Sequence, residues 1–166
     1  QLGICYYLKG DYDKALDFYL KAYKISEEIK DKNGTAVLDG NIGNVYYEQA
    51  DYPKALAYYF KAMKTSEELK NKSSVATWLG NIGLVYTDLG DYSKALDYYS
   101  RALKMAEECG DRNGVAINVG NTGDIYSEQK NYAKALVYYL RSLKMAEELG
   151  NKNSMGIWLG NIGVLY

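Results

Sequence analysis

The chain has 166 residues, 48% of them hydrophobic, and its net charge is −1. Because it carries no excess of basic residues, we expect it to bind neither nucleic acid nor an anionic membrane surface. Histidine is absent, which removes the commonest general base and the commonest zinc ligand, so we expect no metal ion and no cofactor.

A block of forty residues repeats along the chain. The same segment, an Asp or Asn followed by Tyr and then by Lys-Ala-Leu, begins at Asp11, Asp51, Asp91 and Asn131. Repetition at this period is typical of solenoids, in which each unit buries its apolar face against its neighbours. We therefore predict a single array whose first and last repeats are partial. Its repeats are 1–30, 31–70, 71–110, 111–150 and 151–166.

Each repeat is predicted to contain two helices, A and B. An apolar stripe at helical spacing predicts helix A of the third repeat at roughly residues 73–88. The stripe consists of Val75, Leu79, Ile82 and Tyr86. Asp91 can cap helix B, at roughly 92–109, after a turn at 89–90. Pro53 supports this boundary, since proline is tolerated in the first helical turn.

Glycines mark both the ends and the middle of these helices. Gly110 and Gly150 follow B helices, where glycine readily takes the left-handed conformation. A second set lies within the A helices, where glycine costs about 1 kcal/mol relative to alanine. We expect close approach of helix B, through its alanines, to offset that cost. The glycines are Gly43, Gly83, Gly123 and Gly163, and the alanines are Ala55, Ala95 and Ala135.

Tyrosines and cysteines are predicted to belong to the core. Cys5 and Cys109 match apolar residues of other repeats, so we expect both to be buried. The tyrosines recur in register, which indicates interdigitated core more than a stacking platform for bases. They are Tyr6, Tyr46, Tyr86, Tyr126 and Tyr166 on A helices, and Tyr19, Tyr59, Tyr99 and Tyr139 on B helices.

These motifs resemble a known family. Leu79-x-x-Ile82-Gly83-x-x-Tyr86, followed by Gly90-Asp91-Tyr92-x-x-Ala95-x-x-x-Tyr99-x-x-Ala102, resembles a tetratricopeptide repeat, whose usual length is 34 residues. The longer unit, with Leu79-Gly80-Asn81 and Leu159-Gly160-Asn161, is similar to the Leu-Gly-Asn repeat proteins and kinesin light chains. The resemblance implies an all-α fold, a right-handed superhelix of antiparallel helix pairs.

The resemblance also places the A helices along a concave groove, in which matching asparagines hold the backbone of a bound peptide. An asparagine amide offers both donors and an acceptor. The alternative is that these amides bond to adjacent helices. The asparagines are Asn41, Asn81, Asn121 and Asn161, with Gln1 in the equivalent place of the first repeat. The other groove candidates are Asn44, Tyr47, Glu48, Leu84, Asp88, Asp124 and Glu128.

Charge is segregated between the two kinds of helix. We place all twenty Lys and Arg in B helices or turns, and predict a neutral to acidic groove that favours a basic or neutral segment. A site that clamps a terminal carboxylate is not expected, since it needs groove cations. The alternative is that the A-helix acids pair with lysines of neighbouring B helices. These acids are Asp39, Glu48, Asp88, Asp124 and Glu128.

The predicted function is that of a cytoplasmic scaffold, with a signalling role, that binds a protein or peptide. The alternative is a structural or self-association module that spaces or regulates an effector domain outside this chain. No nucleophile motif or phosphate loop supports an enzyme, and no catalytic residue is predicted. Leu159, Ile162 and Tyr166 would be uncovered on the last helix, which favours self-association through the terminal helices.

Overall fold

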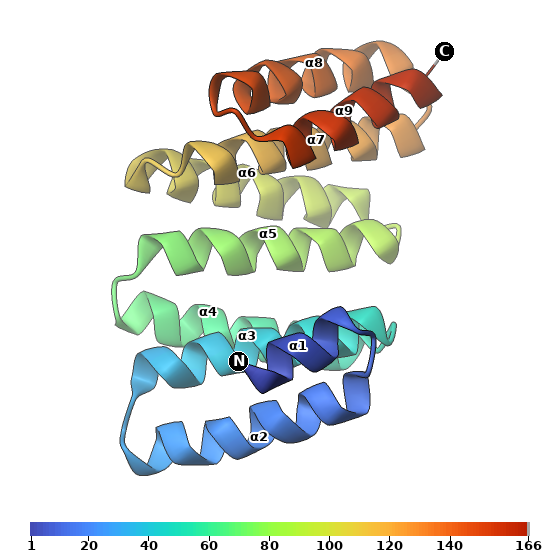
Figure 1. Ribbon diagram of the computed structural model, residues 1–166. Coiled ribbons are helices and arrows are strands. Elements are labelled where there is room, and N and C mark those ends of the chain that lie inside the picture. The colour runs from blue at the N-terminus through green and yellow to red at the C-terminus, as the bar shows by residue number, and fades with distance from the viewer. Residues whose placement is uncertain (166) are drawn as a thin grey trace. The chain divides into compact units, whose positions relative to one another are not determined.

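A computed structural model describes residues 1–165, which form nine α-helices and no strand (Figure 1). Odd-numbered helices are the A helices of the repeats, and even-numbered helices from α2 to α8 are the B helices. The predicted bounds of the third repeat agree with the structure to within one residue. The helices are α1 (Leu2–Leu8), α2 (Tyr12–Glu28), α3 (Lys32–Glu48), α4 (Tyr52–Glu68), α5 (Lys72–Asp88), α6 (Tyr92–Cys109), α7 (Arg112–Glu128), α8 (Tyr132–Glu148) and α9 (Lys152–Val164).

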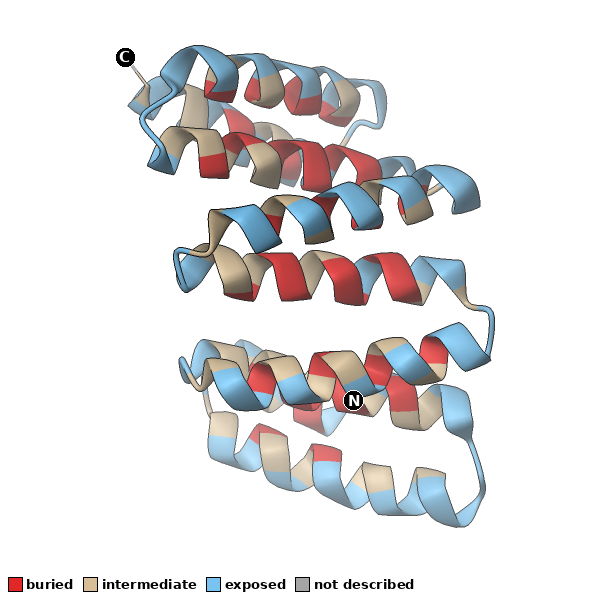
Figure 2. Ribbon diagram, turned by 180° about the vertical axis from the view of Figure 1, so that it is seen from behind, coloured by how far each residue is buried: buried red, intermediate tan, exposed pale blue. Residues whose placement is uncertain are grey.

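The chain divides into two compact units, residues 1–74 and the residues from Val75 onward. In the first unit α1 packs on α2, α2 on α3 and α3 on α4. In the second, α6 packs on α7, α7 on α8 and α8 on α9. Buried residues gather on the faces that the helices turn toward their neighbours (Figure 2). The single array predicted from the sequence stays a prediction.

Side-chain caps begin the helices. Asp91 Oδ1 accepts a 3.2 Å hydrogen bond from the backbone N–H of Lys94, as predicted for the start of α6. The Lys94 ammonium lies 2.7 Å from the same carboxylate and, by bonding to it, lowers the pKa of Asp91. Pro53 lies in the first turn of α4, which confirms its expected place.

The turn after each B helix requires a positive φ. Gly110 and Gly150 have φ of 74° and 65°, which confirms the predicted left-handed conformation. Lys30 and Lys70 occupy the matching positions with φ of 58° and 55°. The turn is therefore imposed by the repeat, and glycine only makes it less strained.

One glycine in each of the first four A helices faces a tyrosine ring of the following B helix. A Cβ at Gly83 would lie 2.6 Å from Tyr99 Cε1, and one at Gly43 would lie 2.7 Å from Tyr59 Cε1. The expected close approach of helix B is confirmed, but the nearest atoms belong to the tyrosine ring and not to an alanine; at Gly43 the carbonyl of Ala55 follows at 3.4 Å. The glycine makes room for the ring, which is almost fully buried.

Tyrosines of the A helices stack on aromatic rings of the B helices. Tyr86 stacks on Tyr98 with centroids 5.4 Å apart, and the Lys94 ammonium lies 5.0 Å from the centre of the Tyr86 ring. The B-helix set is buried, which confirms the core prediction for its members, whereas Tyr166 lies outside the described residues. The buried members are Tyr19, Tyr59, Tyr99 and Tyr139.

Both cysteines are exposed, so the prediction that they are buried was wrong. Cys5 matches Val45, which is buried because α3 packs against α2, whereas no described helix precedes α1 to cover Cys5. Cys109 is the last residue of α6, where side chains face solvent. Its counterpart Leu69 is 40% exposed.

One core position carries a charge in the first unit only. Asp39 is 1% exposed, whereas its counterparts Leu79 and Val119 are apolar and buried. Lys61 Nζ lies 3.1 Å from Asp39 Oδ1, but no well-directed hydrogen bond to that oxygen forms among the described residues. Lys61 also donates to the Tyr23 hydroxyl at 2.6 Å. Burial raises the pKa of Asp39, and Lys61 opposes that shift.

Gly83→Ala should destabilise the chain, because the new Cβ would collide with the buried ring of Tyr99. We expect the free energy of unfolding to fall by about 1–2 kcal/mol in urea denaturation, despite the better helix propensity of alanine. Gly163→Ala is the matched control, since no atom lies within 4 Å of its added Cβ. Equal effects of the two substitutions would contradict the glycine–tyrosine account.

Asp39→Leu should stabilise the chain, because it removes an imperfectly compensated buried carboxylate. We expect a gain of about 1–3 kcal/mol at pH 7, measured by urea denaturation. Because the pKa of Asp39 is raised in the folded state, ionisation of its carboxyl lowers the free energy of unfolding. This destabilisation is absent below the ordinary pKa of 3.8 and grows as the pH rises through the raised pKa. The gain should therefore shrink toward acid pH. A loss of stability at pH 7 would show that the ion pair is net stabilising.

Candidate functional site

A pocket of about 390 Å³ lies between α5 and α7 in the second unit. Three of the residues predicted to form the groove, Asn81, Leu84 and Asn121, meet there. Helix α5 contributes Ala76, Thr77, Gly80, Asn81 and Leu84; α7 and its cap contribute Asp111, Asn113, Gly114, Ile117, Asn118 and Asn121.

Helical spacing explains why these residues share one wall. Thr77, Asn81 and Leu84 follow one another at intervals of four and three, so they lie on one stripe of α5. The adjoining stripe of the same helix, with Leu79 and Ile82, is buried in the core. Burial of that stripe fixes the rotation of α5, so that Thr77, Asn81 and Leu84 face the pocket.

Asn121 combines a place in the pocket with a structural contact. Its side chain hydrogen-bonds the hydroxyl of Tyr99, the ring that packs on Gly83. A carboxamide has two N–H donors and an oxygen with two lone pairs, so one such bond leaves capacity for a further partner. The amide is therefore held in place by the core and can still bond to a ligand.

Asn118 also lines the pocket, and the sequence reasoning did not assign it a role there. It is 6% exposed, and its Nδ2 donates a 2.8 Å hydrogen bond to the carbonyl of Gly114. Its Oδ1 accepts no hydrogen bond among the described residues. A signal was present in the sequence, because the matching positions hold Trp78 and Trp158.

Asp124 and Asn161 lie in a second pocket, of about 230 Å³, and bond to each other. Asp124 Oδ1 accepts hydrogen bonds from the Tyr139 hydroxyl at 2.7 Å and from Asn161 Nδ2 at 2.9 Å. Burial raises the pKa of Asp124, and the two hydrogen bonds oppose that shift. Asn161, like Asn121, therefore follows the alternative that these amides bond to adjacent helices. Glu128 lines the same pocket and is exposed.

The candidates of the first unit are also tied to neighbouring side chains. Asn44 accepts a 2.8 Å hydrogen bond from Tyr59, and Glu48 accepts from the hydroxyls of Tyr7 at 3.1 Å and Tyr12 at 3.3 Å. Burial and the nearby carboxylate raise the pKa of Tyr7 to about 12.

The remaining two candidates of this unit, Asn41 and Tyr47, are half-buried on α3. Asn41 lines a pocket with Gln1, the residue that begins the asparagine series. Tyr47 packs its ring against Tyr52, with centroids 6.0 Å apart.

The distribution of charge differs in one respect from the prediction. Basic residues begin four A helices. The prediction that all Lys and Arg lie outside A helices was therefore wrong, because it started these helices too late. These residues are Lys32, Lys72, Arg112 and Lys152. Arg112 pairs with Glu148 of α8 at 2.6 Å, and Lys32 with Glu68 of α4 at 3.8 Å. Among the described residues that line the α5–α7 pocket, none is a Lys or Arg.

Some A-helix acids pair with a lysine of a B helix, and others lie exposed. Asp39 pairs with Lys61 of helix α4, as the second alternative proposes. Asp88 is exposed at the last turn of α5. In the second unit Asp111 lines the α5–α7 pocket, while Asp124 and Glu128 line the second pocket, where Asp124 is engaged by Tyr139 and Asn161.

Comparison with protein families identifies a repeat family. The family described as tetratricopeptide repeat matches residues 1–68, 34–108 and 74–148. A comparison with curated proteins finds no match to this sequence. In residues 1–165, none of the helices combines the length and hydropathy required to cross a membrane.

Solved structures with the same fold include BtubC from P. vanneervenii, at 23% identity and a TM-score of 0.83, over 99% of this chain and 69% of that one. Aspartyl phosphate phosphatase F from Bacillus subtilis has 20% identity and a TM-score of 0.87, over 99% and 42%. A Rap protein complexed with competence and sporulation factor has 21% identity and a TM-score of 0.85, over 94% and 44%. These likenesses confirm the predicted fold class, an all-α helical repeat. The chain spans less than half of the last two proteins.

Proposed function

The chain belongs to the tetratricopeptide repeat family, and we propose that it is a scaffold that holds an extended or helical segment of a protein or peptide in the grooves lined by its A helices. The observation that carries the proposal is the α5–α7 pocket, where Asn81 and Asn121 face one space. Carboxamides can pair with the N–H and C=O of any peptide unit, whatever its side chain.

The surroundings of the two amides support this use. Gly80 precedes Asn81, and the atoms closest to an added Cβ there belong to Asn118, the nearest at 3.2 Å. Glycine at this place lets a ligand backbone approach α5 closely. Leu84 and Ile117 supply apolar surface beside the amides.

The comparisons lend further support. A Rap protein of this fold is described as complexed with competence and sporulation factor, so the fold can hold a second molecule. Aspartyl phosphate phosphatase F carries the name of an enzyme, but this chain spans only 42% of it. We propose a binding role without catalysis, because the pocket offers amides and apolar side chains and no paired acid and base. The cytoplasmic location and signalling role stay predictions.

The proposal predicts that Asn81→Ala/Asn121→Ala weakens capture of the partner by about tenfold, since each lost hydrogen bond contributes about 0.5–1.5 kcal/mol. The measurement is affinity capture with the immobilised chain, followed by titration of the captured protein. Asn33→Ala/Asn153→Ala is the matched control, because both asparagines are exposed in the first turns of A helices. Equal recovery by all three chains would favour the structural role.

The charge of the groove predicts which segments bind. Because no Lys or Arg lines the pocket and Asp88 and Glu128 lie exposed on the same helices, a basic or neutral segment should bind better than an acidic one. Peptide pools sorted by net charge, titrated at low and high salt, test this; binding should weaken as salt rises. Glu128→Lys should weaken the binding of basic segments. Glu147→Lys, on the exposed face of α8, is its matched control. Tight, salt-insensitive binding of an acidic pool would contradict the proposed field.

A second role, self-association through α9, is favoured by its exposed apolar residues. Leu159 is 53% and Val164 84% exposed, although Leu79 and Val119, which match Leu159, are buried. Light scattering over a concentration series should show dimers or larger species, and Leu159→Lys should lower their population. A chain that is monomeric at millimolar concentration would contradict this role.

A further inference from the structure

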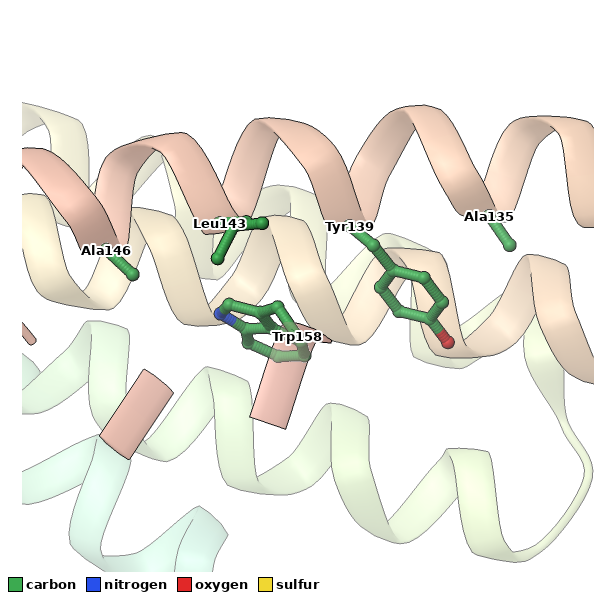
Figure 3. Close-up of a cluster of buried hydrophobic side chains, with 5 residues drawn as sticks. All are labelled: Ala135, Tyr139, Leu143, Ala146 and Trp158. Atoms are coloured by element: carbon green, nitrogen blue, oxygen red, sulfur yellow. The ribbon is translucent and has the colours of Figure 1, made fainter. Parts of the chain in front are cut away.

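At one end of the second unit, a tryptophan of α9 fills a space beside α7 and α8. Trp158 of α9 is 3% exposed and packs under Leu143 and Tyr139 of α8 (Figure 3). Its ring also lies against Gly120 of α7, on the side where a Cβ would stand. The missing Cβ of Gly120 thus makes the space that the indole occupies.

The preceding repeat has the same glycine but a smaller side chain opposite it. Asn118 of α7 matches Trp158, and Gly80 of α5 matches Gly120. Asn118 Oδ1 would lie 3.2 Å from a Cβ at Gly80, so the amide faces the glycine as the indole does in the next repeat. An asparagine is much smaller than an indole, and the pocket of about 390 Å³ opens here.

We propose that this pocket receives an indole ring, the side chain of a tryptophan in the bound segment, and that Asn118 is the residue that selects it. The inference rests on the proposed function, since the ring would enter from the groove. Trp158 shows that an indole fits against a glycine at this repeat position.

The Asn118 amide would provide the polar contact to the ring. Its Nδ2 is held by the carbonyl of Gly114, while its buried Oδ1 accepts no hydrogen bond among the described residues. A buried acceptor without a donor is unfavourable, and an indole N–H supplies one. The terminal torsion of asparagine is soft, so binding would turn the amide until Oδ1 meets the indole N–H.

The rest of the lining selects against other side chains. Ile117 and Leu84 provide apolar walls for the ring body. Asp111 is the one charged residue in the described lining, so a carboxylate side chain would be repelled. Phenylalanine would fill the space without satisfying Asn118.

The test uses free indole and 1-methylindole, which lacks the N–H, as probes of the whole chain. Each is titrated into ¹⁵N-labelled protein while the Gly80 amide and the Asn118 side-chain amide are followed by NMR. We expect saturable shifts at both groups with indole and at least fivefold weaker binding of 1-methylindole. Absence of saturable shifts at these groups would overturn the proposal, and so would equal binding of the two probes, which would show that water already satisfies Asn118.

Two variants separate shape from hydrogen bonding. Asn118→Trp restores the residue of the neighbouring repeats and should abolish binding of both probes. Asn118→Leu, with the residue found at position 38, should bind both equally, because the acceptor is lost while space remains; it also carries the test if the tryptophan variant does not fold. A retained preference for indole in Asn118→Leu would overturn the role of Asn118.

Failure of the tryptophan pocket and failure of the proposed function give different experimental results. Capture of a partner through Asn81 and Asn121 is measured without indole. A chain that captures its partner yet ignores indole overturns the tryptophan pocket alone. A chain that binds indole but captures nothing keeps the pocket and overturns the groove function.

Discussion

The contact between an A-helix glycine and a B-helix tyrosine is the constraint on which each repeat depends. It recurs with the forty-residue period, from Gly3 and Tyr19 to Gly123 and Tyr139. Because the ring lies against the glycine, the two helices keep one rotation and one separation, and the adjoining face of the A helix is left for other contacts. The tyrosine hydroxyl then reaches a polar residue of that face, such as Asn44 or Asp124.

The polar features peculiar to single repeats lie where the chain departs from this plan. Asn118 replaces a tryptophan of other repeats and lines a pocket; Asp124 replaces Leu84 and bonds to Asn161 in a half-buried network. Asp39 replaces a core leucine and engages Lys61. A repeat protein can vary such positions one at a time, because each contacts only neighbouring units.

Much of the fold could be predicted from the sequence, because period, apolar spacing and capping residues are local signals. Asp91, Pro53 and Gly110 are examples, and the structure has each in its predicted role. Tertiary contacts were harder. The partner of Gly83 was expected to be alanine, since spacing alone does not reveal which side chain of the facing helix reaches it. Cys5 was expected to be buried, since its register match ignores whether another helix covers it.

The candidate site was predictable to a similar extent. Helical spacing puts Asn81 and Leu84 on one stripe of α5, the repeat puts Asn121 at the matching place of α7, and the structure brings all three to one pocket. The sequence could not decide which asparagines are engaged within the chain. Asn161 bonds to Asp124, a choice that depends on how α7, α8 and α9 meet. Asn118 was visible only as an irregularity, because its open acceptor is a property of three-dimensional packing.

The central claim is that the A-helix groove binds the backbone of a partner segment. A crystal structure of the chain with the protein that it captures tests this most directly. The account predicts main-chain N–H or C=O groups of the partner within hydrogen-bond distance of the side chains of Asn81 and Asn121, between α5 and α7. A partner seated on the exposed face of the B helices, with both asparagines untouched, would contradict it.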